Sequence, residues 1–394
     1  MTPEQLDYLR GCAGAARFAY NWGLERWQKE YQAVKDGVSS IKPNGGALRK
    51  TFNAEKKIAL PGNYAMLPPE EKRQYFSWMS KYSKCVPQQA LRNLDKAFTA
   101  FFEKKRDYPV FKSRARHSSF YIENSQVGFT TKTYLYKGKE VTRPALKLPK
   151  MNAVFELTEE PRFKHHTLMS ATFSCVADEW FVSLQYNVKI NDPKPTKKRL
   201  KTEVGIDAGI TTFATTVDHQ GVVKKEDGPR PMKMLVDRLR RLDRHMARQV
   251  MGSKNRDKTK RRRARLMAKI ANIRRDFQHK LSTKLATQYH RIKVETLNIK
   301  SMLKNHKLAL HISDRAWYQF QTMLDYKTKA RGGELVKVDR YFPSTRWMPC
   351  CNIKLKSVTL NDRTLRCTSC GTEVDRDENA ARNILNWDAW ITYS

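Results

Sequence analysis

The sequence has few acidic residues for its number of basic ones, and it has no long apolar run. Asp and Glu total 39 against 76 Lys and Arg, which leaves a formal net charge of +37. No stretch approaches the roughly 18 apolar residues of a membrane-spanning helix, and we find no signal peptide or lipidation motif. A nucleic acid is therefore favoured over a membrane surface as the polyanionic partner, because phosphate neutralisation releases counterions. We expect a cytoplasmic, nucleoid-associated protein with no membrane partner.

Cysteine is also scarce, with seven residues in 394, and four of the seven lie between positions 350 and 370. This distribution argues against a disulfide framework and for a metal site in a reducing compartment. Cys367 and Cys370 form a C-x₂-C knuckle, and Cys350 and Cys351 precede it. Thiolates on two loops predict a structural Zn²⁺ site, with free thiols as the alternative. Adjacent cysteines seldom ligate one metal, so Cys350 is the weakest of the four candidates.

The most informative stretch that the sequence does contain lies near its middle, at residues 204–217, and the other segments are interpreted in relation to it. Its β-branched and apolar residues predict a strand pair ahead of a turn at 218–221. Asp207 lies in the first strand, between Gly205 and Gly209. A buried carboxylate is costly unless a positive group meets it, and flanking glycines permit close approach of a ligand. The alternative is a solvated aspartate between structural glycines.

Further acids end a strand or begin a helix at long range. Glu295 closes the β-rich run 291–295, and Asp375 and Asp377 precede an amphipathic helix that reaches Leu385. Three acids on separate elements of an α/β domain can converge on divalent metals, since Mg²⁺ prefers carboxylate oxygens. Two such ions roughly 4 Å apart activate water and stabilise the leaving oxygen of a phosphodiester. The acids therefore predict a metal-dependent nuclease.

The remaining pattern orders the chain. Apolar spacing predicts helices, strands or loops in the following segments: helices over 3–35, 70–82 and 88–105; short strands over 118–188; a linker over 191–199; two helices within 232–289; a loop over 301–312; a helix over 313–330; a strand over 334–338. The two helices within 232–289 carry an almost wholly basic outer face. We interpret that face as a surface that binds a nucleic-acid backbone rather than as a solvated surface.

Together these segments resemble the RuvC-like nuclease of transposon-encoded TnpB proteins and of miniature type V CRISPR effectors. The run that contains Asp375 and Asp377 matches the family pattern "DRDxNAAxNI", in which the second acid is catalytic. The resemblance implies Asp207, Glu295 and Asp377 as catalytic ligands of two Mg²⁺ ions, with Asp375 as the fallback. Relatives have C-x₂-C in both halves of the zinc site, and alignment places Met348 at the first ligand position here.

The resemblance also implies an architecture, namely α/β plus β-barrel. Its parts are a helical recognition region (1–112), a wedge β-barrel (113–198), an RNase H-like (RuvC) nuclease domain (199–345), an inserted zinc knuckle (346–371) and a C-terminal nuclease segment (372–394). Relatives have a strand before the first helix, whereas this chain begins at Met1-Thr2-Pro3. We therefore expect a barrel without one edge strand, or a trimmed start.

Nucleic-acid contacts are implied at several positions. In the family, the start of the helix at 88–105 helps to read a DNA motif beside the target, and Tyr108 to Lys112 match its "YPxFK" turn. The resulting candidates are Lys84, Gln88, Tyr108, Lys112, Arg261, Arg262, Arg263, Arg274 and Arg275.

The implied function is that of an RNA-guided DNA endonuclease of a transposable element. Its partners would be a guide RNA and a target double-stranded DNA, cut next to a short adjacent motif. Two alternatives stay open: a miniature CRISPR effector with a CRISPR-derived guide, and a nuclease-inactive RNA-guided repressor. The three acids argue against the repressor, because such proteins lose them.

Overall fold

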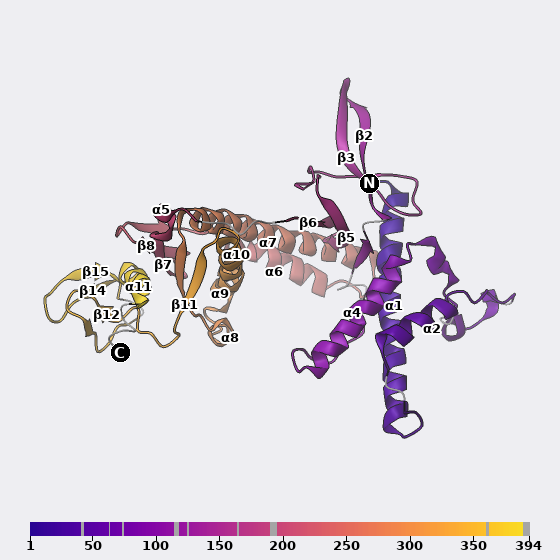
Figure 1. The fold of residues 1–394 in the computed structure, drawn as a ribbon, viewed down its shortest axis with the longest axis horizontal. Helices are drawn as coiled ribbons and strands as arrows, with labels where there is room; N and C mark the ends of the chain where they lie inside the picture. Colours follow the sequence, from indigo (N-terminus) through magenta and orange to yellow (C-terminus); the bar gives the residue numbers. More distant parts are fainter. Residues whose placement is uncertain are drawn as a thin grey trace. The chain divides into compact units, whose positions relative to one another are not determined.

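The computed structural model describes residues 1–40, 43–62, 64–72, 75–113, 118–123, 126–163, 165–189, 195–359 and 362–388 (Figure 1). The chain forms two compact units, residues 1–189 and 190–394. The predicted linker at 191–199 falls at this division, although 191–194 lie outside the described residues. Within the described part of the chain, no helix is long and apolar enough to cross a membrane.

The first unit is built on a long helix that starts with a capping box. Thr2 Oγ1 accepts from the Gln5 backbone N–H, and Gln5 Oε1 accepts from that of Thr2. The helices of the unit are α1 (Pro3–Lys35), α2 (Gly45–Glu55), α3 (Pro69–Lys72) and α4 (Cys85–Phe102), with 3₁₀ turns η1 (Tyr64–Met66) and η2 (Ser77–Lys81). The prediction of one helix over 70–82 is wrong, because α3 and η2 are separate short turns. Helices α1 and α4 pack closely at Gly23, where a Cβ would lie 2.7 Å from Leu91.

Two antiparallel sheets complete the first unit. One has the order β1-β5-β6, from β1 (Ser119–Glu123), β5 (Thr167–Val176) and β6 (Glu179–Asn187). The other has the order β2-β3-β4, from β2 (Gly128–Tyr136), β3 (Lys139–Lys147) and β4 (Phe155–Glu156). Among the described residues no strand pairing joins the two sheets, so a closed barrel stays a prediction. One hydrophobic core runs through helices and sheets alike, from Leu9 to Phe173.

The second unit contains a five-stranded mixed sheet. Its order is β11-β10-β7-β8-β9, from β7 (Glu203–Asp207), β8 (Ala214–Asp218), β9 (Val223–Glu226), β10 (Arg291–Glu295) and β11 (Glu334–Val338). Strands β7, β10 and β11 are parallel neighbours, whereas β8 pairs antiparallel with both β7 and β9. The carboxyl ends of the three parallel strands therefore meet at one edge, where ligands of open α/β sheets bind.

Helices cover this sheet and extend from it. They are α5 (Lys197–Leu200), α6 (Pro231–Ala247), α7 (Lys254–Gln288), α8 (Ile299–Met302), α9 (Ala309–Arg315), α10 (Trp317–Lys329) and α11 (Arg376–Leu385). The loop predicted over 301–312 is confirmed only for 303–308, because α8 and α9 occupy its two ends. Ala316, with φ 48°, separates α9 from α10. Helix α11 packs directly on β7 because Gly205 has no side chain; a Cβ there would collide with the Ala381 carbonyl.

Two small hairpins lie between β11 and α11. They pair β12 (Trp347–Met348) with β13 (Ile353–Lys354) and β14 (Thr364–Arg366) with β15 (Glu373–Asp375). A separate miniature core of Met348, Leu355, Leu365 and Cys367 joins them. This arrangement presents the cysteine-bearing turns of both hairpins to each other.

Candidate active site

Two of the predicted acids lie side by side at the carboxyl edge of the parallel strands. Asp207 is the last residue of β7 and Glu295 the last of β10. The two strands are hydrogen-bonded neighbours with Ile206 opposite Val294, so the following residues are also adjacent. Asp377 comes from the first turn of α11, the helix that packs on β7. The fold thus brings acids from three separate segments to one edge.

These acids are electrostatically coupled. The pKa of Asp207 is raised to about 8, first by burial and then by the negative charges of Glu295 and Asp377, while Arg376 opposes the shift. Burial also raises the pKa of Glu295. Crowded carboxylates store unfavourable energy that a divalent cation would offset. The donor set, all carboxylate oxygens, is the set that Mg²⁺ prefers.

The carboxylates are close without being tightly clustered. Among the described residues, only the four cysteines form a group of three or more His, Cys, Asp or Glu side chains close enough to hold one metal ion, with ligand atoms within 4.8 Å of one another. The carboxylates do not form such a group. Asp377 is instead paired with Arg376, whose Nη2 lies 3.1 Å from Asp377 Oδ1. Arg376 therefore neutralises part of the negative charge in this arrangement.

Asp375 and Asp377 differ in what their side chains do. Asp375 is the N-cap of α11: its Oδ1 accepts from the backbone N–H groups of Asp377 and Glu378, each at 3.0 Å. Its Oδ2 accepts from Lys225 Nζ at 2.8 Å. Although burial opposes it, these contacts hold the pKa of Asp375 below its ordinary value. Both oxygens of Asp375 are therefore engaged in structure.

Sequence reasoning missed a buried Asp-Arg pair that shapes the segment after Asp207. Arg315 is 1% exposed and donates to the carbonyl oxygens of Ile210, Thr211 and Gly228. Asp314 accepts from the backbone N–H groups that begin α6, at 3.1–3.2 Å. A signal existed in the sequence, since an adjacent Asp and Arg precede the apolar face that starts at Trp317.

Two asparagines of α11, also missed, hold the segment that leads into the cysteine hairpins. Asn379 Nδ2 and Asn383 Nδ2 each donate to the Trp347 carbonyl at 2.7 Å. Asn383 also donates to the Ser344 carbonyl at 2.6 Å. Both side chains are buried. The helix that carries Asp377 is thereby anchored to the start of the first cysteine hairpin.

The structure brings all four predicted cysteine ligands together. The Sγ atoms of Cys350, Cys351, Cys367 and Cys370 all lie within 4.8 Å of one another. Cys350, the weakest candidate from sequence, is 3.5 Å from Cys370. Asn352, which follows Cys351, adopts φ 53°, so the turn that carries the two adjacent cysteines contains a left-handed residue. A four-thiolate group fits Zn²⁺.

Met348, which aligns with the first ligand of relatives, points elsewhere. It is 1% exposed and belongs to the miniature core. The hydrogen bond between Cys370 and Thr372 lowers the pKa of the Cys370 thiol to about 6. In this loop the thiols that lie near Cys367 and Cys370 are therefore those of Cys350 and Cys351.

The predicted arginines fall into two groups. Arg263 donates to Asp243 of α6, and Arg274 Nη1 donates to the Ser313 carbonyl at 2.9 Å. Arg262 and Arg275 are exposed, with no hydrogen-bond or ion-pair partner among the described residues. Arg261 is exposed as well, and it has an interaction within the chain. Helix pairing therefore occupies some of these cations and leaves others for an external anion.

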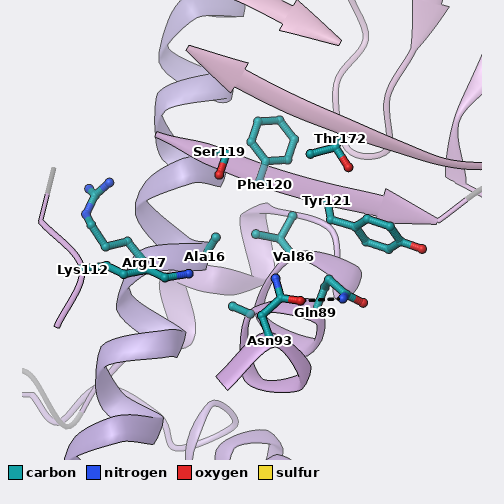
Figure 2. Close-up of a pocket in the computed structure, with 11 residues that line it drawn as sticks. Ala16, Arg17, Val86, Gln89, Asn93, Lys112, Ser119, Phe120, Tyr121 and Thr172 are labelled. Atoms are coloured by element: carbon teal, nitrogen blue, oxygen red, sulfur yellow. Dashed lines mark hydrogen bonds between the residues drawn. The ribbon is translucent and has the colours of Figure 1, made fainter. Parts of the chain in front are cut away.

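The first unit has a cavity of about 300 Å³ beside the other predicted contacts (Figure 2). Its lining includes Arg17, Gln89, Asn93, Lys112 and Tyr121. Gln89 Nε2 donates to Asn93 Oδ1 at 3.0 Å, and Figure 2 shows this amide pair below the strand that carries Tyr121. The cavity thus combines cations, amides and an aromatic ring.

Lys112 and Tyr108 are held in place by the helices. Lys112 Nζ lies 3.8 Å from the centre of the Tyr20 ring, and burial lowers its pKa. Tyr108 packs edge-on against Phe98 and Phe101 and is 40% exposed. Lys84 is exposed immediately before α4 and Gln88 is half-buried in its first turn. Neither lines the cavity, whose amides come from Gln89 and Asn93 instead.

Comparisons with known proteins agree with this description. Family models match at residues 1–36 (helix-turn-helix domain), 185–306 (probable transposase) and 317–384 (Cas12f1-like, TNB domain). A Streptomyces pristinaespiralis protein, provisionally named as an RNA-guided DNA endonuclease, is 32% identical over 98% of this chain and 86% of its own length. The Escherichia coli protein InsQ, provisionally named likewise, is 27% identical over 97% and 89%.

One solved structure shares the fold. The structure of a Cas12f1–sgRNA–target DNA complex aligns with a TM-score of 0.60 at 14% identity, covering 98% of this chain and 83% of that one. This likeness supports the predicted RuvC-containing nuclease fold.

Proposed function

The chain belongs to the TnpB family, and from this membership we propose that it is an RNA-guided DNA endonuclease of a transposable element. The observation that carries the proposal is the coupled set Asp207, Glu295 and Asp377 at one sheet edge. The retained acids favour an active nuclease over an inactive repressor. A chain with this activity would act on DNA in the cytoplasm, at the nucleoid.

The three acids would hold two Mg²⁺ ions. When bound, such ions lower the pKa of water and stabilise the leaving oxygen of a phosphodiester. Asp207 and Glu295 supply ligands from a rigid sheet edge, whereas Asp377 supplies one from a helix start. Arg376, now paired with Asp377, would lie beside the developing phosphate charge. Asp375 keeps α11 capped and does not ligate.

The four cysteines would hold one structural Zn²⁺. Because Asn379 and Asn383 join α11 to the first cysteine hairpin, a folded knuckle would steady the helix that carries Asp377. The zinc would therefore support the nuclease centre through structure, with no part in the chemistry.

The first unit would contact guide RNA and target duplex DNA. We assign it the helical recognition region and a wedge formed by its two sheets. The cavity near the start of α4 has amides that can read base edges and cations that can meet phosphates. It is the candidate reader of the short motif beside the target, together with Lys84 and Gln88.

The test uses the whole chain with the RNA that co-purifies with it. That RNA is sequenced, and duplex DNA matching its free end is supplied beside a randomised flank, with Mg²⁺. Cleavage beside one flank sequence is expected, and Asp207→Asn should abolish it. Failure of the wild type to cut any matching DNA would refute the proposal, and an RNA encoded by a CRISPR array would favour the CRISPR alternative.

A further inference from the structure

The hairpin of β2 and β3 is exposed along most of its length. Figure 1 shows it extending beyond the rest of the first unit. Strand β4 pairs with β3 only at Ala145 and Leu146, so the outer hairpin, residues 130–144, has no third strand among the described residues. A free two-stranded hairpin is marginally stable, so a long one signals a task other than core formation. We call residues 130–144 the ribbon.

The side chains of the ribbon are sorted by face. Residues directly opposite in an antiparallel pair share a face, and successive residues alternate. One face carries Lys132 opposite Arg143, Tyr134 opposite Val141, and Tyr136 opposite Lys139. The other carries Thr131 opposite Pro144, Thr133 opposite Thr142, and Leu135 opposite Glu140. All three strand cations and both tyrosines therefore lie on the first face, and the ribbon's acid lies on the second.

The cationic face is arranged for an external partner. Lys132 and Lys139 are exposed, and Tyr136 is 58% exposed. Lys132 Nζ lies 5.7 Å from the Tyr134 ring, and the Tyr134 hydroxyl donates to Glu156, which fixes the ring. Lys137 at the turn approaches the Tyr136 ring at 5.6 Å. Aromatic rings between cations form a surface on which bases can stack while phosphates meet positive charge.

We propose that this face of the ribbon binds an unpaired segment of the guide RNA, an inference that rests on the proposed function. Stacking on tyrosine needs bases that are not already stacked in a duplex. Target DNA arrives as a duplex, whereas a guide RNA offers loops and ends from the start. The positive face matches the charge of the backbone, and the stacking is independent of sequence.

The first experiment measures binding of a labelled oligouridylate by the full chain, without divalent cation, at several salt concentrations. Lys132→Gln/Lys139→Gln/Arg143→Gln should flatten the salt dependence by roughly 2 log units per log unit, about 0.7 for each lost contact. Its charge-matched control, Lys29→Gln/Lys50→Gln/Lys96→Gln, changes exposed helix lysines of the same unit. Equal effects of the two triples would overturn the proposal.

The second experiment compares neighbouring positions on opposite faces. Tyr136→Ser should weaken oligouridylate binding roughly tenfold, because base stacking is lost. Leu135→Ser, on the other face, should leave it unchanged, while thermal melting confirms that both variants fold. Ultraviolet cross-linking should attach the RNA to Tyr136. Cross-links confined to other segments would overturn the proposal. So would a result in which the ribbon variants lose affinity for a DNA duplex of equal length and keep their affinity for RNA.

These measurements are separate from the cleavage test. If the ribbon variants bind RNA as the wild type does and the wild type cleaves matching DNA, only the proposal for the ribbon is refuted. If RNA binding depends on the ribbon but the wild type cuts no matching DNA, only the proposed endonuclease function is refuted.

Discussion

Lys225 Nζ lies 2.8 Å from Oδ2 of Asp375, and this ion pair separates the roles of two acids that stand only two positions apart. With its other oxygen, Asp375 caps α11. Asp377 begins the same helix, and its charge acts on Asp207. Of the two acids in the family pattern, one thus has both oxygens engaged in holding the helix, whereas the other is paired with Arg376; the charges of both raise the pKa of Asp207.

The first prediction contrasts these acids. Asp375→Ala removes an N-cap, which costs about 1 kcal/mol of stability, and cleavage should persist at reduced temperature. Asp377→Ala should abolish Mg²⁺-dependent cleavage and leave the melting temperature within a few degrees of the wild type. Thermal melts and cleavage of guide-matched DNA check both. Persistent cleavage by Asp377→Ala with none by a folded Asp375→Ala would reverse the assignment.

The second prediction concerns pH. The folded pKa of Asp207 is about 8 and its ordinary value is 3.8. The folded chain therefore keeps a proton that the unfolded chain releases, so this residue's contribution to stability is present below pH 4 and is lost as the pH rises towards 8. In metal-free protein, Asp207→Asn should raise the melting temperature at pH 8 more than at pH 5.

A companion measurement tests the metal at the same residue. Mg²⁺ should raise the melting temperature of the wild type near pH 8, where ionised Asp207 is available, and should have little effect on Asp207→Asn. Calorimetric titration at pH 7 in buffers of different ionisation enthalpy should show proton release on Mg²⁺ binding. A metal effect of equal size in both proteins would exclude Asp207 as a ligand.

The third prediction concerns zinc. Elemental analysis should find about one Zn²⁺ per chain. Because all four Sγ atoms meet, Cys350→Ser should lose zinc as Cys367→Ser does. Cys175→Ser is the control, since that thiol lies in β5 of the first unit. Full zinc content in Cys350→Ser would show that three thiolates suffice.

The fourth prediction separates the arginines. Arg262→Gln/Arg275→Gln should lower affinity for RNA or DNA of any sequence and flatten the salt dependence by roughly one unit per lost contact. Arg263→Gln should mainly reduce stability, because Asp243 loses its partner. Binding isotherms at several salt concentrations, with thermal melts, distinguish the two effects. An unchanged salt slope in the double variant would mark those cations as solvated.

The fifth prediction concerns the cavity of the first unit. Gln89→Ala, which also frees Asn93, should broaden the set of flanking sequences that permit cleavage, without changing affinity for guide RNA. Thr99→Ala, an exposed position on the same helix, is the control. Sequencing the cleaved members of a flank library checks this. An unaltered flank preference would show that the cavity does not read the motif, and Lys84 and Gln88 would then be the remaining candidates.

The sequence by itself determined much of the local structure. Apolar spacing and end signals located α1, α4, α6, α7, α10 and most strands, because these signals act within a few residues. It also identified Asp207, Glu295 and the pair Asp375 and Asp377 as candidates, since each lies where a strand ends or a helix begins, and the family resemblance selected Asp377 from the pair. It failed at the two ends of 301–312, where a basic composition concealed α8 and α9.

Tertiary structure decided which of several chemically similar residues takes each role. The second oxygen of Asp375 is occupied because Lys225, 150 positions away, donates to it, and Arg263 is structural because α6 brings Asp243 to it. Cys350 joins the cluster because the miniature core packs its hairpin against the one that carries Cys367 and Cys370. The ribbon's cationic face exists only in one pairing register, since a shift of one residue would exchange its faces. These outcomes depend on contacts between residues distant in sequence, which local periodicity does not encode.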